Sequence, residues 1–337
     1  MRRHIRALLA ACLYYSGLLW LYAAHKLRNR AVVLMYHRVL PADADSFSHA
    51  GIVVTPATFD RHMRFIARHF RVVDLAGFRA GLDAPAFGAR TCLVTFDDGW
   101  QDNHANALPV LRKHGIPMAL FAATGYVGTD STFWQERLTR LLYVASRQGF
   151  ATDTLSDLGA ADILALNDAE ARARAREIVT ALKRGRDQAR VERVLASLEA
   201  ANASTAQPAG IGDDRFMSWA QLRELAASGL VTVGSHTHSH AILPEIGYEK
   251  TREEFITSAR LLRQNGLPDT RECAYPNGIV DDDVARAARD AGMSLAFVTR
   301  NRLVEHGDDH YHLRRVNIHE QATASNPELL CLILGIF

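Results

Sequence analysis

Two adjacent carboxylates stand at the end of an apolar run. The segment Leu93–Gly99 reads LVTFDDG, so Asp97 and Asp98 follow residues typical of a buried β-strand. Metal-assisted amide hydrolysis uses such a pair, because one carboxylate can hold the ion while the other accepts a proton from water. An Asx turn in which Gly99 supplies a permissive backbone is the alternative interpretation. A catalytic pair would need further ligands from elsewhere in the chain.

Histidines with the spacing of metal ligands lie far downstream, in the sequence GSHTHSH. His236, His238 and His240 follow the apolar run VTV. Two imidazole nitrogens and one carboxylate suit zinc or another divalent first-row ion and leave coordination sites open for water. We predict that His236 and His240 bind a divalent metal ion together with Asp98. Zinc is the preferred ion, with cobalt, nickel or manganese as alternatives.

A third motif, AYPNG, follows another short apolar run. Tyr275, Pro276 and Asn277 form a turn whose backbone N–H groups could hold a developing oxyanion and contact substrate. A protonating group for the leaving amine is also needed. His37 after the first apolar run and His319 in LRRVNIH are the two candidates, and both also fit ordinary histidines at loop ends.

The elements that must position these residues alternate along the chain. Short apolar runs predict strands, and segments with helical periodicity separate them, which is typical of a parallel sheet or barrel. The strands are expected at residues 31–36, 71–75, 91–96, 118–123, 231–234, 272–275, 295–299 and 313–318. Helices are expected at 56–70, 103–114, 218–229, 248–265 and 282–291. Carboxyl ends of barrel strands share one face, so the three motifs should converge there.

Three further segments flank or interrupt this alternation. Residues 129–215 are rich in Ala, Arg, Glu and Asp and predict a helical insertion. Residues 321–337 are expected to form a tail or short helix after the domain at 31–320.

Residues 1–30 predict an apolar helix associated with a membrane. Ala7–Ala24 contains 18 residues without a charge, which is the minimum length for a spanning helix, and arginines or lysine flank it on both sides. The charges favour neither face of the cytoplasmic membrane. If this helix packs on the domain instead, a cytoplasmic location is the alternative.

Composition excludes several classes of protein. The chain has 337 residues, 48% of them hydrophobic and 23% charged, as in a globular protein with a large core. A formal net charge of +2 gives no reason to expect nucleic acid as a partner. The four cysteines form no CxxC pair and are expected to be buried thiols: Cys12, Cys92, Cys273 and Cys331.

The motifs TFDDG, HTHSH and AYPNG, in this order, together with the opening LMYHRV, resemble the polysaccharide deacetylase family, which is carbohydrate esterase family 4 or the nodulation deacetylase homology domain. The resemblance covers roughly Val32 to Ile318. It implies a deformed (β/α) barrel and metal-dependent removal of N- or O-acetyl groups from a polysaccharide or lipid-linked sugar.

The resemblance also implies roles for individual residues. Asp97 would be the general base and Asp98 a metal ligand, while His236 and His240 match the histidines of the H-[ST]-x-x-H motif. His319 matches the histidine acid of the family's last motif, with His37 as its rival. One departure is clear, because Ala274 stands where the family often carries an arginine that holds the base, and Arg271 is offset by three residues.

Three other functions compete with sugar deacetylation. An amidohydrolase of the same fold could act on a small non-sugar amide, but it would have little need of the Ala7–Ala24 segment. A homologue with impaired catalysis could only bind carbohydrate. An iron oxygenase also uses two histidines and one carboxylate, although such sites usually lie in double-sheet folds. We therefore expect an acetylated glycan or lipid-linked sugar as substrate, with no indication of an oligomeric state.

Overall fold

The computed structural model describes residues 2–150, 152–185, 188–205 and 212–336. Residues 151, 186–187 and 206–211, all within the expected insertion, lie outside this described part. The chain divides into two compact units. Unit 1 comprises Met1–Ala42, Ala50–Thr129 and Phe216–Phe337, and unit 2 comprises Asp43–His49 and Asp130–Arg215.

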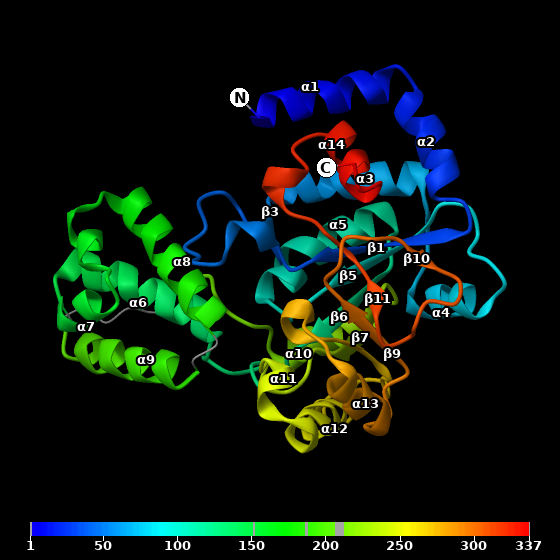
Figure 1. Ribbon diagram of the computed structural model, residues 1–337. Coiled ribbons are helices and arrows are strands. Elements are labelled where there is room, and N and C mark those ends of the chain that lie inside the picture. Colours follow the sequence, from blue (N-terminus) through cyan, green and yellow to red (C-terminus); the bar gives the residue numbers. More distant parts are fainter. Residues whose placement is uncertain (1, 151, 186–187, 206–211, 337) are drawn as a thin grey trace. The chain divides into compact units, whose positions relative to one another are not determined.

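A curved sheet forms the centre of unit 1 (Figure 1). Its parallel strands lie in the order β1 (Arg30–Tyr36), β5 (Thr91–Phe96), β6 (Met118–Ala122), β7 (Val231–Ser235), β8 (Glu272–Ala274) and β9 (Leu295–Val298). Two short strands join its ends, because β11 (Leu313–Arg314) pairs with β9 and β12 (Val316–Asn317) pairs with β1. The predicted deformed (β/α) barrel is therefore confirmed. The strand expected at residues 313–318 is divided at Arg315, where the chain passes from one partner strand to the other.

Additional short strands lie at the rim of this sheet. The strand β10 (Val304–Glu305) runs antiparallel to the start of β1, and β4 (Arg71–Val72) runs parallel to β5. A separate pair is formed by β2 (Arg38–Val39) and β3 (Val53–Val54).

The strands are apolar on both faces because each face packs against other residues. Along β1, Val32 and Leu34 belong to the outer core with the surrounding helices, whereas Val33 belongs to the core inside the barrel. The helix α4 (Leu75–Asp83), which was not expected from the sequence, adds Phe78 to that inner core, 5.9 Å from the ring of Phe297.

Helices surround the sheet, and local signals fix their ends. Thr55 caps α3 (Pro56–His69) by accepting from the Thr58 N–H, and a capping box of Ser218 and Gln221 opens α10 (Trp219–Ala227). The other helices of unit 1 are α5 (Leu108–His114), preceded by a π-helical turn at Asn103–Ala107, α11 (Leu243–Ile246), α12 (Tyr248–Gln264), α13 (Asp282–Asp290) and α14 (Asn326–Ile333).

The apolar N-terminal segment forms two helices rather than one. The helices α1 (Arg2–Tyr15) and α2 (Leu18–Lys26) are separated by Gly17, whose φ of 81° lies in the left-handed region that breaks a helix. Their buried residues, which include Ala10 and Leu19, belong to the same outer core as α3 and α14 (Figure 1).

Within the described residues, no single helix has both the length and the hydropathy needed to cross a membrane. The pair His4–Tyr15 and Leu18–Lys26 meets that test together, with a bend of 82° between its two parts. Cys92, Cys273 and Cys331 are buried as expected, but Cys12 is exposed on α1, so that prediction was wrong.

Unit 2 is helical and has its own hydrophobic core. It contains α6 (Trp134–Gln148), α7 (Thr152–Asp157), a 3₁₀ turn at Ala161–Ala165, α8 (Asp168–Gly185) and α9 (Gln188–Ala203). The segment Asp43–His49, which the sequence did not assign to this unit, joins it through Asp214. That carboxylate accepts from the Ser46 hydroxyl at 2.6 Å and from the Phe47 N–H at 3.0 Å.

Candidate active site

Three potential metal ligands meet at the carboxyl ends of β5 and β7. Asp98 Oδ1 lies 3.3 Å from His236 Nε2 and 3.6 Å from His240 Nε2. One ligand atom from each residue lies within 4.8 Å of the others. Asp98 and His236 are buried and His240 is nearly so. The separate sequence motifs therefore converge into one cluster of two imidazoles and a carboxylate.

Neighbouring groups orient His236 and Asp98 so that one lone pair of each remains available for a cation between them. His236 Nδ1 lies 2.8 Å from the Ala274 carbonyl oxygen, which can only accept, so Nδ1 carries the proton and Nε2 is free to bind a cation. The Trp100 indole N–H donates to Asp98 Oδ2 at 2.7 Å and leaves Oδ1 for the ion. The donor set and its orientation fit a zinc-type divalent ion.

Strained backbone concentrates around this cluster. Non-glycine residues rarely adopt a positive φ, and holding one there costs about 1–3 kcal/mol. Among the described residues that do so, four are in the three motifs: Asp98 (76°), Thr237 (66°), His240 (57°) and Asn277 (58°). Two of these four residues, Asp98 and His240, are potential metal ligands, so the surrounding fold holds part of the cluster in strained conformations.

Asp97 is held by a buried arginine. Arg315 donates from Nη1 to Asp97 Oδ1 at 2.6 Å and from Nη2 to Asp97 Oδ2 at 2.7 Å, and neither residue is more than 1% exposed. Burial alone would raise the pKa of the Asp97 carboxyl, but the charge and hydrogen bonds of Arg315 together with the neighbouring His236 outweigh it, so the pKa lies below its usual value. Asp97 is therefore ionised at neutral pH, as a general base must be.

The Asp98 carboxyl is likewise kept ionised. Burial would raise the pKa of Asp98, but His236, His37 and His240 lower it below its usual value.

His37 also lies near Asp97. Its Nε2 is 3.9 Å from Asp97 Oδ2, and its side chain is 13% exposed. The π-helical turn after β5 positions it, because the Asn103 amide donates to the His37 carbonyl at 2.8 Å. Burial lowers the pKa of His37, and the charges of Asp98 and Asp97 oppose that effect only in part.

A buried ion pair of Arg38 and Asp102 packs against the Trp100 ring. The Arg38 guanidinium lies 4.1 Å from the centre of the Trp100 ring and donates from Nε to Asp102 at 3.0 Å. The Phe216 ring stacks on the Trp100 ring, with the ring centres 4.2 Å apart. The indole is thus fixed in the position from which it donates to Asp98.

The other residues expected at the site follow β8 and β12. Tyr275 is fully buried with Phe255 in the core between β8 and the outer helices, so its side chain is not accessible to substrate. Pro276 and Asn277 form a 3₁₀ turn after β8. His319 precedes a 3₁₀ turn after β12, and its carbonyl accepts from the Thr323 hydroxyl at 2.8 Å. The AYPNG motif contacts the metal ligands through the Ala274 carbonyl, which lies 2.8 Å from His236 Nδ1.

Arg315 and Trp100 were not predicted from the sequence. The absence of an arginine at position 274 pointed to a missing partner for Asp97, and Arg315 fills that role from the strand segment that closes the barrel. A signal was present, because a charged residue between Leu313 and Val316 in an apolar strand must find a buried partner.

Comparison with known proteins identifies the family. The model of the polysaccharide deacetylase family matches residues 85–160 and 166–296, which is more than half of the chain. A poly-beta-1,6-N-acetyl-D-glucosamine N-deacetylase from Staphylococcus epidermidis is 21% identical over 313 residues, covering 88% of this chain and 81% of that protein. The corresponding enzyme of Staphylococcus aureus strain N315 is 27% identical over 113 residues, which are 31% of this chain and 39% of that protein.

Solved structures share the fold. The Streptococcus pyogenes deacetylase PplD in complex with acetate aligns with a TM-score of 0.58 at 16% identity, covering 90% of this chain and 98% of that one. IcaB from Ammonifex degensii aligns with a TM-score of 0.58 at 21% identity, covering 90% and 97%. With the family match over more than half of its length, this chain belongs to the polysaccharide deacetylase family.

Proposed function

We propose that this hydrolase of carbon–nitrogen bonds removes N-acetyl groups from a β-1,6-linked N-acetylglucosamine polymer, using a divalent metal ion held by Asp98, His236 and His240. The observation that carries the proposal is the cluster of these three ligands beside an ionised Asp97. The substrate is inferred from the S. epidermidis relative, which matches along most of both chains. Lipid-linked sugars and O-acetyl groups are the alternative substrates.

In this mechanism Asp97 accepts the proton from the attacking water. Arg315 occupies one lone pair of each carboxylate oxygen, so the carboxylate is held in place but can still accept a proton. General-base catalysis of this kind contributes roughly 10²–10⁴ in rate. A divalent cation held by the three ligands supplies Lewis acidity toward water and toward the acetyl carbonyl.

His37 is the group that we assign to protonate the leaving amine. At 3.9 Å from Asp97 it can receive the proton that Asp97 has taken and deliver it to nitrogen when the C–N bond breaks. Its lowered pKa means that the ring is neutral before this transfer, which suits a relay between two groups at neutral pH. The 3.9 Å approach of His37 to Asp97 supports this assignment.

Acetate release from defined oligosaccharides tests this function. The purified protein, supplied with zinc or cobalt, should release acetate from β-1,6-linked N-acetylglucosamine oligomers faster than from β-1,4-linked ones. Asp97→Asn should lower the rate at least 100-fold while retaining bound metal, because it removes the base and leaves Asp98, His236 and His240 in place. Asp283→Asn, at an exposed aspartate of α13, is the matched control and should be fully active.

Two results would contradict the proposal. Release of acetate by Asp97→Asn at the rate of the unchanged protein would remove Asp97 from the mechanism. No release from any N-acetylated glycan by metal-loaded protein, together with hydrolysis of a small non-sugar amide, would establish the competing amidohydrolase function.

A further inference from the structure

Large hydrophobic side chains are exposed together on the two N-terminal helices. Seven residues form this N-terminal apolar face, with exposed fractions between 42% and 80%: Ile5, Leu8, Leu9, Tyr15, Leu18, Leu21 and Tyr22. The one other exposed large hydrophobic residue in the described chain is Leu164 of unit 2, at 39%. Scattered apolar residues are normal on protein surfaces, whereas a contiguous apolar patch indicates a contact with another apolar surface.

The opposite side of the same helices is already packed against unit 1. Ala10 of α1 and Leu19 and Ala23 of α2 are at most 2% exposed and belong to the outer core. No charged residue occurs from Ala7 to Ala24, so this stretch of the two helices is apolar toward the domain and toward the outside, whereas arginines begin α1 and Lys26 ends α2. Helices that are apolar all round are found in deeply buried or membrane-contacting positions.

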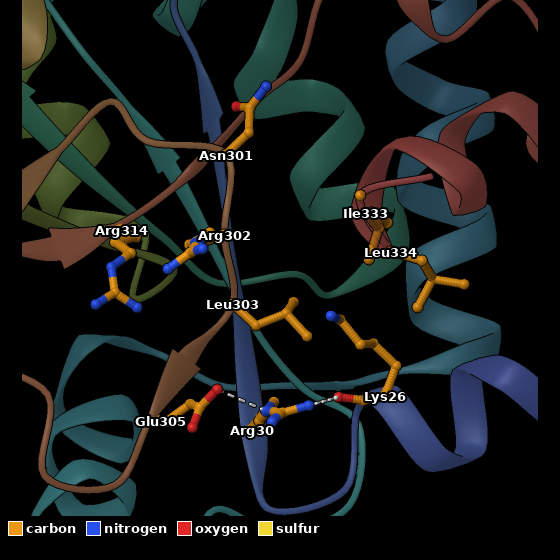
Figure 2. Close-up of a pocket in the computed structure, with 10 residues that line it drawn as sticks. Lys26, Arg30, Asn301, Arg302, Leu303, Glu305, Arg314, Ile333 and Leu334 are labelled. Atoms are coloured by element: carbon orange, nitrogen blue, oxygen red, sulfur yellow. Dashed lines mark hydrogen bonds and ion pairs between the residues drawn. The ribbon is translucent and has the colours of Figure 1, made fainter. Parts of the chain in front are cut away.

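A basic pocket lies at the end of α2. The cavity has a volume of about 370 Å³. Its lining, drawn in Figure 2, includes Lys26 at the end of α2, Arg30 of β1, Arg302, Arg314 and a single acidic residue, Glu305. Arg30 is paired with Glu305 at 2.9 Å, as the dashed line in Figure 2 marks.

Two of the cations in this pocket are free to bind a ligand. Within the described part of the chain, the Lys26 ammonium and the Arg302 guanidinium make no ion pair or hydrogen bond, whereas Arg314 lies 3.4 Å from Asp308. A pocket with an excess of unpaired positive charge favours an anionic group such as a phosphate.

We propose that α1 and α2 lie flat on an anionic phospholipid membrane, with the N-terminal apolar face inserted among the acyl chains and a lipid phosphate bound in the basic pocket. An apolar helix face with cations beside it matches the chemistry of a bilayer interface, where acyl chains and anionic headgroups lie next to each other. One partner, the membrane surface, therefore binds both the basic pocket and the N-terminal apolar face. This inference is independent of the deacetylase function.

Other occupants fit the same features less well. A second copy of this chain could cover the apolar face, but two-fold pairing would bring two sets of unpaired cations toward each other. A helix pair that spans the bilayer would have to leave the core to which Ala10 and Leu19 belong. A membrane surface requires neither change.

Vesicle flotation of the full-length protein tests the proposal. The protein should float with vesicles of phosphatidylcholine containing 30% phosphatidylglycerol and bind pure phosphatidylcholine much more weakly, and high salt should weaken the binding. Lys26→Gln combined with Arg302→Gln should weaken binding to the anionic vesicles about 30-fold, since each cation near the surface contributes about 5-fold. Leu8→Ser combined with Leu21→Ser should weaken it roughly 10-fold or more on both vesicle types.

Matched controls separate this surface from general effects. Leu164→Ser changes an exposed leucine of unit 2, and Arg260→Gln removes an exposed charge from α12, on the other side of the barrel in Figure 1. Both should bind vesicles like the unchanged protein. All variants replace exposed or unpaired side chains, so their circular dichroism and thermal midpoints should be unchanged.

Several outcomes would overturn the proposal. Equal binding to both vesicle types, or undiminished binding by either double variant, would show that the apolar face and the basic pocket are not the membrane-binding surface. Resistance to extraction by alkaline carbonate would show a spanning segment instead. A dimer in light scattering that Leu8→Ser with Leu21→Ser dissociates, without vesicle binding, would identify a second copy as the occupant. Binding of inorganic phosphate without flotation would make the pocket a site for a free anion.

Discussion

Replacing Arg315 with methionine should shift the pH dependence of catalysis. Both nitrogens of the guanidinium are bonded to Asp97 in a site where neither residue is exposed, so the variant leaves a buried, unpaired carboxylate. Breaking a buried ion pair in this way costs about 3–5 kcal/mol. A pKa unit corresponds to about 1.36 kcal/mol, so the pKa of Asp97 should rise by roughly 2 units or more.

The direction of the shift follows from the ionised state that catalysis requires. In the unchanged protein the pKa of Asp97 lies below its usual value, so the base is ionised throughout the neutral range. In Arg315→Met the acid limb of the kcat/KM profile should move upward by roughly 2 pH units, with activity recovering as the pH rises. The assay is acetate release between pH 4 and pH 9. Metal content should remain the same, because the hydrogen bonds of Arg315 go to Asp97, Thr95 and the Val298 carbonyl.

Arg315→Lys is the conservative variant, because it keeps the positive charge but loses the two parallel hydrogen bonds to Asp97. The acid limb of its kcat/KM profile should lie between those of the unchanged protein and Arg315→Met. The methionine variant should also unfold at lower urea concentration. An acid limb at the same pH in all three proteins would refute the role of Arg315 in holding the base ionised. Loss of bound metal in both variants would assign Arg315 to the metal site instead.

Four further substitutions give three distinct predictions. Trp100→Phe keeps the aromatic stacking but removes the N–H that donates to Asp98, so zinc affinity measured against a chromophoric chelator should fall 10- to 100-fold, and unchanged affinity would contradict this. His37→Gln should lower kcat by roughly 10²–10⁴ with metal retained, whereas His319→Gln should leave kcat nearly unchanged; the reverse result would transfer the acid role to His319. Gly278→Ala should lower the thermal midpoint by several degrees, because φ is 64° and a Cβ would lie 1.9 Å from a threonine oxygen; a stable variant would show that this turn is not restrictive.

Local sequence signals predicted most elements of the barrel. The strand at residues 91–96 and the helix opened by Ser218 lie where periodicity and capping place them. These features depend on residues close in sequence, so a single chain contains the information. The convergence of the three motifs followed from one rule, that the carboxyl ends of parallel strands meet on one face.

Features that depend on distant residues were not predicted. The pairing of Arg315 with Asp97 requires the closing segment to lie between β9 and β1, which no local pattern encodes. The helix break at Gly17 was missed because a single glycine is tolerated in an apolar helix, and the packing of α1 against α14 accompanies the bend. The segment 43–49 lies far in sequence from the helices that it joins.

Titration of metal-free protein with zinc tests the central claim most directly. Protein treated with a chelator should release no acetate from β-1,6-linked N-acetylglucosamine oligomers, and activity should return in proportion to zinc up to one ion per chain. Asp98→Ala and His236→Ala should neither bind the ion nor recover activity, because each removes one of three ligands. Full acetate release by metal-free protein, or by either variant without bound metal, would contradict the assignment of Asp98, His236 and His240 as the metal site.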